Sequence, residues 1–153
     1  MTWYDPDIEA PRTSTILDLL KGRLLGDTDL EEFLQGSGRI FRQRRFEEAT
    51  HALVVREEET PGKAQTFTGQ RPLRVQAAAY CPVDETDIDK WHEAVQDRVY
   101  GHWTGFRPSL SKGRLLQPIH RIGVPTAPFY EDNRGQYISV STWLVVYIHN
   151  RTI

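Results

Sequence analysis

One run of alternating aromatic and β-branched residues, at positions 136–152, constrains the fold of this chain more than any other feature. Side chains two positions apart point to the same face of a β-strand, so the run divides into two faces. The first face carries Ile138, Val140, Thr142, Leu144, Val146 and Ile148. The second face carries Tyr137, Ser139, Ser141, Trp143, Val145 and Tyr147. A strand of roughly a dozen residues is well above the usual length of about five or six. Because the second face is wide and only half polar, we expect another layer or another chain to cover it.

The composition is that of a single-domain globular protein. With 153 residues the chain is long enough for one domain that buries roughly two thirds of its unfolded surface. Apolar residues make up 39% and charged residues 26%, which suits a modest core. The formal net charge of −2 gives no reason to expect nucleic acid as the main ligand, because nucleic-acid-binding domains are usually strongly basic.

The sequence also predicts a compartment. Cys81 is the single cysteine, which excludes an intramolecular disulfide and fits a reducing environment. Residues 1–7 lack the basic start and the apolar stretch of a signal peptide. The longest apolar run, residues 143–148, is too short to cross a membrane. We therefore expect a protein made in the cytoplasm, with no membrane partner.

The N-terminal part of the chain predicts an arm and two helical segments. Residues 1–12 hold two prolines and no periodicity, which predicts an extended arm. Its aromatic residues, Trp3 and Tyr4, are expected either to anchor the arm to a neighbouring surface or to pack back on their own domain. Leucines at helical spacing then predict a helix over 14–25, followed by a short helical turn through 28–34.

Strand patterns dominate the middle of the chain. Residues 39–46 and 51–58 predict a pair of strands. Residues 60–72 hold two prolines and two glycines without apolar periodicity, which predicts a long polar loop or hairpin tip. Strand alternation returns over 73–80, where small alanines leave room for a neighbouring element to pack closely.

The clearest helix of the sequence covers residues 86–100. Thr86 is the expected N-cap, Asp89 stands in a weak capping-box position, and Gly101 is expected to end the helix. A short strand over 119–124 follows before the terminal strand.

The order of these elements favours an α+β fold. Strands bunched around few helices predict a single mixed or antiparallel sheet with a long C-terminal strand and helices packed mainly on one face. We expect one such assembly domain over 13–153, preceded by the arm.

No set of histidines has the spacing of a metal site. The sequence Trp91-His92-Glu93 resembles part of a zincin helix, but the second histidine that this motif needs is replaced by Gln96. We therefore expect no bound metal and interpret the imidazoles as surface or packed groups. The five histidines are His51, His92, His102, His120 and His149.

Candidate catalytic residues have simpler structural explanations. Cys81 could act as a nucleophile with His102 or His120 as its base, but no thiol-enzyme signature flanks it, so we favour a buried structural cysteine. The acidic residues at 84–89 are explained by favourable interaction with the N-terminus of the following helix. We expect no catalytic residue and no cofactor.

The strongest charge cluster consists of Arg39, Arg42, Arg44 and Arg45. Such a cluster can contact phosphate or the acidic surface of a protein partner. Because glutamates lie close by in the sequence, we favour cross-strand or intersubunit ion pairing. A ring of these charges facing a DNA-filled channel is the alternative.

The layout of the chain resembles that of the tail terminator proteins of long-tailed bacteriophages, also called minor tail or tail-completion proteins. The resemblance covers most of the chain beyond residue 12 and rests on the arrangement and size of elements. Its parts are the leucine-rich helix, a polar loop, the strand at 73–80, the helix at 86–100 and the long strand through Trp143-Leu144-Val145-Val146-Tyr147. The arm and the segment 106–117 depart from the pattern.

This resemblance implies a virion protein at the tail–neck junction, assembled in the host cytoplasm. Six copies would form a ring that caps the tail tube, stops its polymerisation and offers a docking face for the head connector. The implied partners are other copies of the chain, the tail tube protein and a neck or head-completion protein, with non-specific contact to DNA in the channel.

A closed ring needs two different patches on each subunit. The candidate interface residues are Trp3, Tyr4, Arg39, Arg42, Arg44, Arg45, Lys63, Phe67, Arg71 and Trp143. Three alternatives stay open: a head-completion or neck adaptor protein, a small hydrolase or transferase using Cys81 or the acidic cluster, and a single-strand nucleic-acid binder using the arginines and aromatics.

Overall fold

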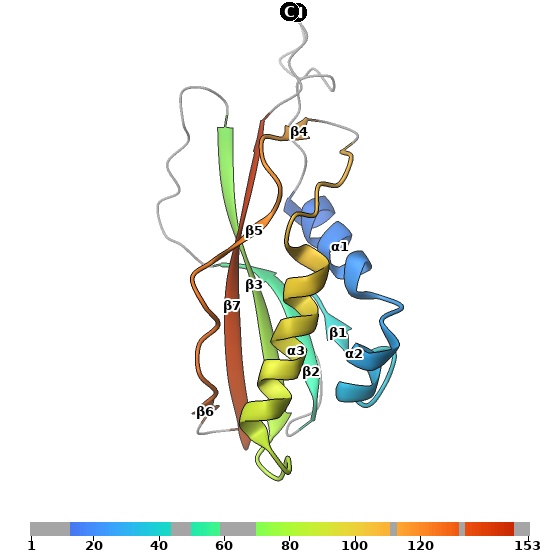
Figure 1. Cartoon of the computed structure of the whole chain (residues 1–153), viewed down its shortest axis with the longest axis vertical. Helices are drawn as coiled ribbons and strands as arrows, with labels where there is room; N and C mark the ends of the chain where they lie inside the picture. Colours follow the sequence, from blue (N-terminus) through green and yellow to red (C-terminus); the bar gives the residue numbers. More distant parts are fainter. Residues whose placement is uncertain (1–12, 44–49, 59–69, 111–112, 132–133, 149–153) are drawn as a thin grey trace, which may run out of the picture.

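The long C-terminal strand lies inside a seven-stranded mixed sheet that carries its helices on one face (Figure 1). The computed structural model describes residues 13–43, 50–58, 70–110, 113–131 and 134–148. Within these residues the elements are α1 (Thr13–Leu24), α2 (Thr28–Phe33), β1 (Ile40–Phe41), β2 (Ala52–Glu57), β3 (Gln70–Pro82), α3 (Ile88–Trp103), β4 (Arg114–Leu115), β5 (His120–Ile122), β6 (Phe129–Glu131) and β7 (Gln136–Ile148). The predicted α+β class, with a single mixed sheet and a long terminal strand, is confirmed.

The antiparallel pair of β3 and β7 is the centre of the sheet. The two strands have 13 residues each and pair along their whole length, from Gln70 opposite Ile148 to Pro82 opposite Gln136. On the other side of β3, β2 pairs antiparallel, and β1 then adds in parallel. Pairing of β7 with a strand of equal length explains how so long a strand is stabilised.

The outer side of β7 is covered by an interrupted strand. β4, β5 and β6 follow one another along β7, all antiparallel to it, as Figure 1 shows in orange. Single backbone hydrogen bonds fill the gaps: the N–H of Leu116 donates to the carbonyl of Val146, and that of Thr126 to the carbonyl of Val140. The sequence after the predicted strand 119–124 predicts a loop over 125–135, and the pairing of β6 and of Thr126 with β7 corrects this expectation.

The main core lies between the sheet and the helices. α1 and α3 lie against each other over the same face, with α2 at the end of α1 (Figure 1). Small side chains on this face of the sheet, including Ala77, Ala79 and Ser139, are buried where α3 approaches. Gln96 on α3 reaches the carbonyl of Ala77 at 3.1 Å. The prediction that the alanines admit a closely packed element is confirmed.

Trp143 is a core residue, contrary to its prediction as an interface residue. It is fully buried and packs edge-on against Trp103 of α3, with ring centroids 5.4 Å apart. Its indole N–H donates to the hydroxyl of Ser141 at 2.9 Å. The second face of β7 is thus covered by another layer of the same chain, so it is not available to a partner.

Helix ends differ slightly from expectation. Asp27 caps α2, and α3 begins one residue later than predicted, because the side chain of Asp87, not Thr86, accepts the N–H of Lys90. α3 also continues through Gly101 to Trp103, whose buried indole N–H donates to the carbonyl of Leu20 at 3.0 Å. That buried contact outweighs the poor helix propensity of one glycine.

The loop predicted over 60–72 ends earlier than expected, before residue 70. Residues 70–72 belong to β3, because pairing with β7 extends the strand beyond the segment that shows alternation. The predicted arm 1–12 and the rest of this loop lie outside the described residues.

Candidate functional site

Among the elements that the structure describes, no helix covers the second face of the sheet, and this face displays apolar side chains in rows. One row runs across four strands: Phe41, Val54, Ala78 and Val140. The next contains Ala52, Tyr80, Ile138 and Phe129. Leu144 and Val146 continue the same face along β7. We call the partly or fully exposed members of this surface the helix-free apolar face, namely Phe41, Ile122, Phe129, Val140, Leu144 and Val146.

This face combines a small buried cluster with an accessible periphery. Ala52, Val54, Ala78, Tyr80 and Ile138 form a second hydrophobic cluster, separate from the main core. Val140, Leu144 and Val146 are only partly buried. The face of β7 that begins at Ile138 is therefore the one left without a helix, while the half-polar face faces the core. Sequence periodicity identified the two faces but not which of them the helices cover.

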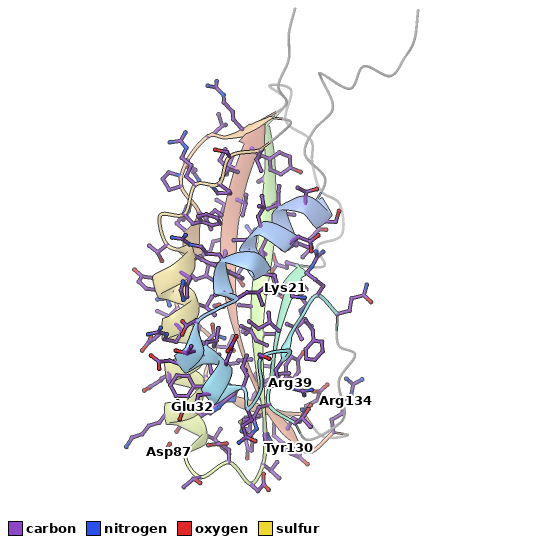
Figure 2. The ribbon with its side chains drawn as sticks, turned by 90° about the vertical axis from the view of Figure 1, so that its right-hand side faces the viewer. Lys21, Glu32, Arg39, Asp87, Tyr130 and Arg134 are labelled. Carbon is purple, nitrogen blue, oxygen red and sulfur yellow. The ribbon has the colours of Figure 1, made fainter. Side chains whose placement is uncertain are left out.

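The interrupted outer strand extends the apolar surface. Ile122 is 37% exposed, Phe129 and Tyr130 are each 48% exposed, and Val124 is 80% exposed. The register places Ile122 beside Thr142 and Phe129 beside Ile138, so both continue the helix-free apolar face. Figure 2 shows Tyr130 at the same end of the molecule as Asp87, the cap of α3.

Neither edge of the described sheet offers a long unpaired strand. β1 has two residues, and the opposite edge is divided among β4, β5 and β6, none longer than three residues. Short and interrupted edges disfavour the addition of a further strand from another molecule. A partner would consequently meet the face of this sheet and not extend it.

The described arginines of the predicted cluster make contacts within the subunit. Arg39 donates to the carbonyl of His51 at 3.1 Å and to the hydroxyl of Thr50 at 2.7 Å, and its guanidinium lies over the ring of Phe41. Arg42 forms an ion pair with Asp18 of α1. The described partner of Arg42 is therefore a helix of the same subunit, whereas Arg39 contacts the residues just before β2.

The side chains of the other predicted interface residues lie outside the part of the chain that the structure describes. Trp3, Tyr4, Arg44, Arg45, Lys63 and Phe67 lie outside the described residues. The backbone of Arg71 lies in β3 opposite Tyr147, but the placement of its side chain is outside the description.

A buried polar cluster surrounds the single cysteine. The sulfur of Cys81 lies 3.3 Å from Nε2 of His92, whose Nδ1 lies 2.6 Å from the hydroxyl of Ser139. Desolvation, with a smaller contribution from the charge of Glu85, raises the pKa of the thiol to about 12. Desolvation also lowers the pKa of His92 to about 4. Both groups are neutral at pH 7, so the thiol is not activated as a nucleophile.

This cluster differs from the pair considered in the sequence. His102 contacts Asp27, and exposed His120 pairs in register with Leu144 on the helix-free side, so neither adjoins Cys81. His92 and Gln96 were noticed only as an incomplete zinc motif. Their spacing of four residues on α3, facing small residues of the sheet, was the available signal for a shared buried site.

Among the residues that the structure describes, no three histidine, cysteine or acidic side chains are grouped so that they could hold a metal ion. Within the same residues, no helix has both the length and the apolar character needed to cross a membrane.

Comparison with known proteins supports the fold. No known family and no curated protein matches the sequence. Among solved structures, one protein that bears only a sequence identifier for a name aligns with 93% of this chain and 99% of its own, with a TM-score of 0.54 and 12% identity. At that identity the similarity concerns the fold alone.

Proposed function

We propose that this chain is a non-enzymatic virion subunit, a bacteriophage tail terminator, and that it assembles with copies of itself into a six-membered ring. The helix-free apolar face is the observation that carries the proposal. The single sheet of an α+β domain leaves one face without helices, and here that face holds partly exposed Val140, Leu144 and Val146. The layout resemblance supplies the ring and its place at the tail–neck junction.

The chemistry of the face suits a protein partner. Polar groups lie among its apolar residues, since Arg56 donates to Gln76 at 3.1 Å, and Arg74, the cross-strand neighbour of Leu144, lies 3.7 Å from Glu58. Protein–protein interfaces commonly combine apolar and polar groups. Burying further apolar area stabilises an association by roughly 25 cal/mol per Å² before the costs of association are subtracted. The helix-free apolar face therefore replaces the Trp143 face as the candidate patch.

A second patch is needed for a ring, because a closed heterologous interface joins two different surfaces. The exposed Val124 and Tyr130 of the outer strand segment are candidates for it, and Tyr130 pairs in register with Tyr137 on the helix side of the sheet, away from the first patch. In this proposal one surface of the ring copies the docking surface of the tail tube, and the other withholds the edge that further tube subunits need. Such a function is steric and requires no catalytic residue or cofactor.

The proposal is tested by tube growth in vitro. Purified chain added to polymerising tail tube protein is expected to arrest growth at a defined length and to cap tube ends in electron micrographs. The variant Leu144→Glu, which places a charge on the helix-free apolar face, should lose this effect. Leu25→Glu is the control, because it makes the same change at an exposed leucine, 51% accessible, that follows α1 on the other side of the sheet.

Two results would contradict the proposal. Tubes that grow normally in the presence of the folded chain would exclude a terminator, and binding to filled heads without any effect on tubes would favour the neck adaptor. Equal capping by wild type and Leu144→Glu would remove the proposed face from the interface.

A further inference from the structure

The interrupted outer strand leaves a pocket at the edge of the sheet. The pocket measures about 530 Å³ and lies between α3, the chain that links β5 to β6, and Ser139 of β7. Its volume is within the usual range for sites that bind small molecules. Figure 1 shows the linking chain running along the outer side of β7, with α3 in front of the sheet.

Gln96 lines this pocket and carries a buried side-chain acceptor. The residue is 3% exposed, and its amide nitrogen donates to the carbonyl of Ala77 at 3.1 Å and to the carbonyl of Ser139 at 3.3 Å. These two carbonyls fix the orientation of the amide, because an exchanged oxygen would face two acceptors. In the described part of the chain, Oε1 of Gln96 has no hydrogen-bond partner. A buried acceptor of this kind is normally satisfied by an ordered water or by a donor from a bound molecule.

The wall that α3 contributes is acidic. Asp89, Glu93 and Asp97 follow one another at intervals of four residues and all line the pocket. Their side chains are exposed, and none forms an ion pair with the described residues. The aligned carboxylates produce a negative potential over one side of the pocket.

The other titratable groups of the pocket are His92 and Arg121. His92, at the base of the pocket, is uncharged at neutral pH because desolvation lowers its pKa to about 4. Arg121 lies across the pocket, where its Nε donates to the carbonyl of Gly123 at 2.9 Å and its guanidinium lies over the ring of Tyr100 at 4.6 Å. The pocket thus combines a buried acceptor and three carboxylates with a single lining arginine, whose guanidinium is held by Gly123 and Tyr100.

We propose that this pocket binds a small organic cation that carries N–H donors, such as a guanidinium or primary ammonium group. One N–H would donate to Oε1 of Gln96, and the positive charge would lie against Glu93 and Asp97. Hydrogen bonds from a charged donor are stronger than those between neutral groups, and a planar guanidinium can satisfy several acceptors at once. An anion would meet the acidic wall, and an apolar molecule would leave Gln96 unsatisfied.

Agmatine, a small alkyl guanidine with a primary amine, is the probe. Titration into the ¹⁵N-labelled full chain should shift the side-chain amide resonances of Gln96 saturably, and calorimetry should give the same dissociation constant. The double variant Glu93→Gln with Asp97→Asn should weaken binding roughly tenfold, because each exposed ion pair contributes a factor of about two to five. Glu32→Gln, an exposed neutralisation on α2 (Figure 2), is the matched control and should bind as wild type does.

The source of the cation is distinguished by a second probe. A tripeptide with a central arginine should bind as tightly as agmatine if the natural ligand is an arginine side chain, and much more weakly if it is a free amine. Failure of agmatine, methylguanidinium and the tripeptide to shift the Gln96 amide at millimolar concentration would overturn the proposal. Equal affinity of the double variant and wild type would overturn it as well. Neither result bears on the helix-free apolar face, which lies on the other side of the sheet from α3.

Discussion

Replacement of Asp27 is expected to loosen the junction between the N-terminal helices and α3. The side chain of Asp27 is 2% exposed and accepts the N–H of Leu30, which caps α2. It also accepts two hydrogen bonds from Arg98, each at 2.8 Å, and lies 2.6 Å from Nε2 of His102. One carboxylate therefore joins the turn before α2 to the second half of α3.

The expected loss of unfolding free energy follows from these contacts. Loss of an N-cap costs about 1 kcal/mol, and loss of charged hydrogen bonds at a buried carboxylate costs about 2 kcal/mol. We take the lower end for the second value because the side chain of Arg98 is 42% exposed and lies 3.7 Å from Asp29, so it keeps a partner. Asp27→Ala is expected to lower the free energy of unfolding by about 3 kcal/mol, and Asp27→Asn, which can still cap, by about 2 kcal/mol.

Urea denaturation at one fixed protein concentration measures both values. Asp29→Asn is the control and should change the unfolding free energy by less than about 0.5 kcal/mol, because that carboxylate is largely exposed. Burial raises the pKa of Asp27, but hydrogen bonds from His102, Leu30 and Arg98 outweigh it and hold the pKa below 3.8. The contribution is accordingly present above pH 3.8 and is lost as pH falls through the pKa of the folded state. A loss below about 1 kcal/mol for Asp27→Ala would refute this reasoning.

Three further predictions concern the core. The folded state keeps His92 neutral down to a pKa of about 4, while the unfolded chain binds a proton near pH 6.5. The free energy of unfolding should therefore fall by up to about 3 kcal/mol as pH drops between these values. Urea titrations at several pH values measure this dependence, which His92→Gln should flatten. The thiol of Cys81 should resist a disulfide reagent at pH 8 until the chain is unfolded, and Cys81→Ala should assemble normally; fast reaction of the folded protein would contradict the raised pKa. Trp143→Ala should cost about 3–5 kcal/mol of unfolding free energy, whereas a small loss would mean that the indole does not fill the core.

Local patterns in the sequence predicted much of the fold. Alternation located β3 and β7, leucine spacing located α1, and the acidic start located α3. These features depend on neighbouring residues, so a single sequence contains them. β4, β5 and β6 were mostly missed because two or three residues show no periodicity and depend on pairing with β7.

Packing between residues far apart in the sequence determines which face of β7 is buried and where the pocket lies. Both faces of β7 contain apolar residues. The face with Trp143 becomes the core face because the small side chains of Ser139 and Ser141 let α3 approach. Trp143 was therefore assigned to an interface although it belongs to the core. The pocket beside Gln96 depends on a gap between β5 and β6, a property of the folded sheet that no linear motif records.

The mass of the purified chain in solution, measured by sedimentation velocity over a range of concentrations, tests most directly whether the helix-free apolar face joins subunits. We expect wild type and Leu25→Glu to form a closed species six times the mass of the chain, and Leu144→Glu to sediment as a folded monomer. A wild-type protein that stays monomeric at every concentration, or a Leu144→Glu variant that assembles as wild type does, would contradict the account.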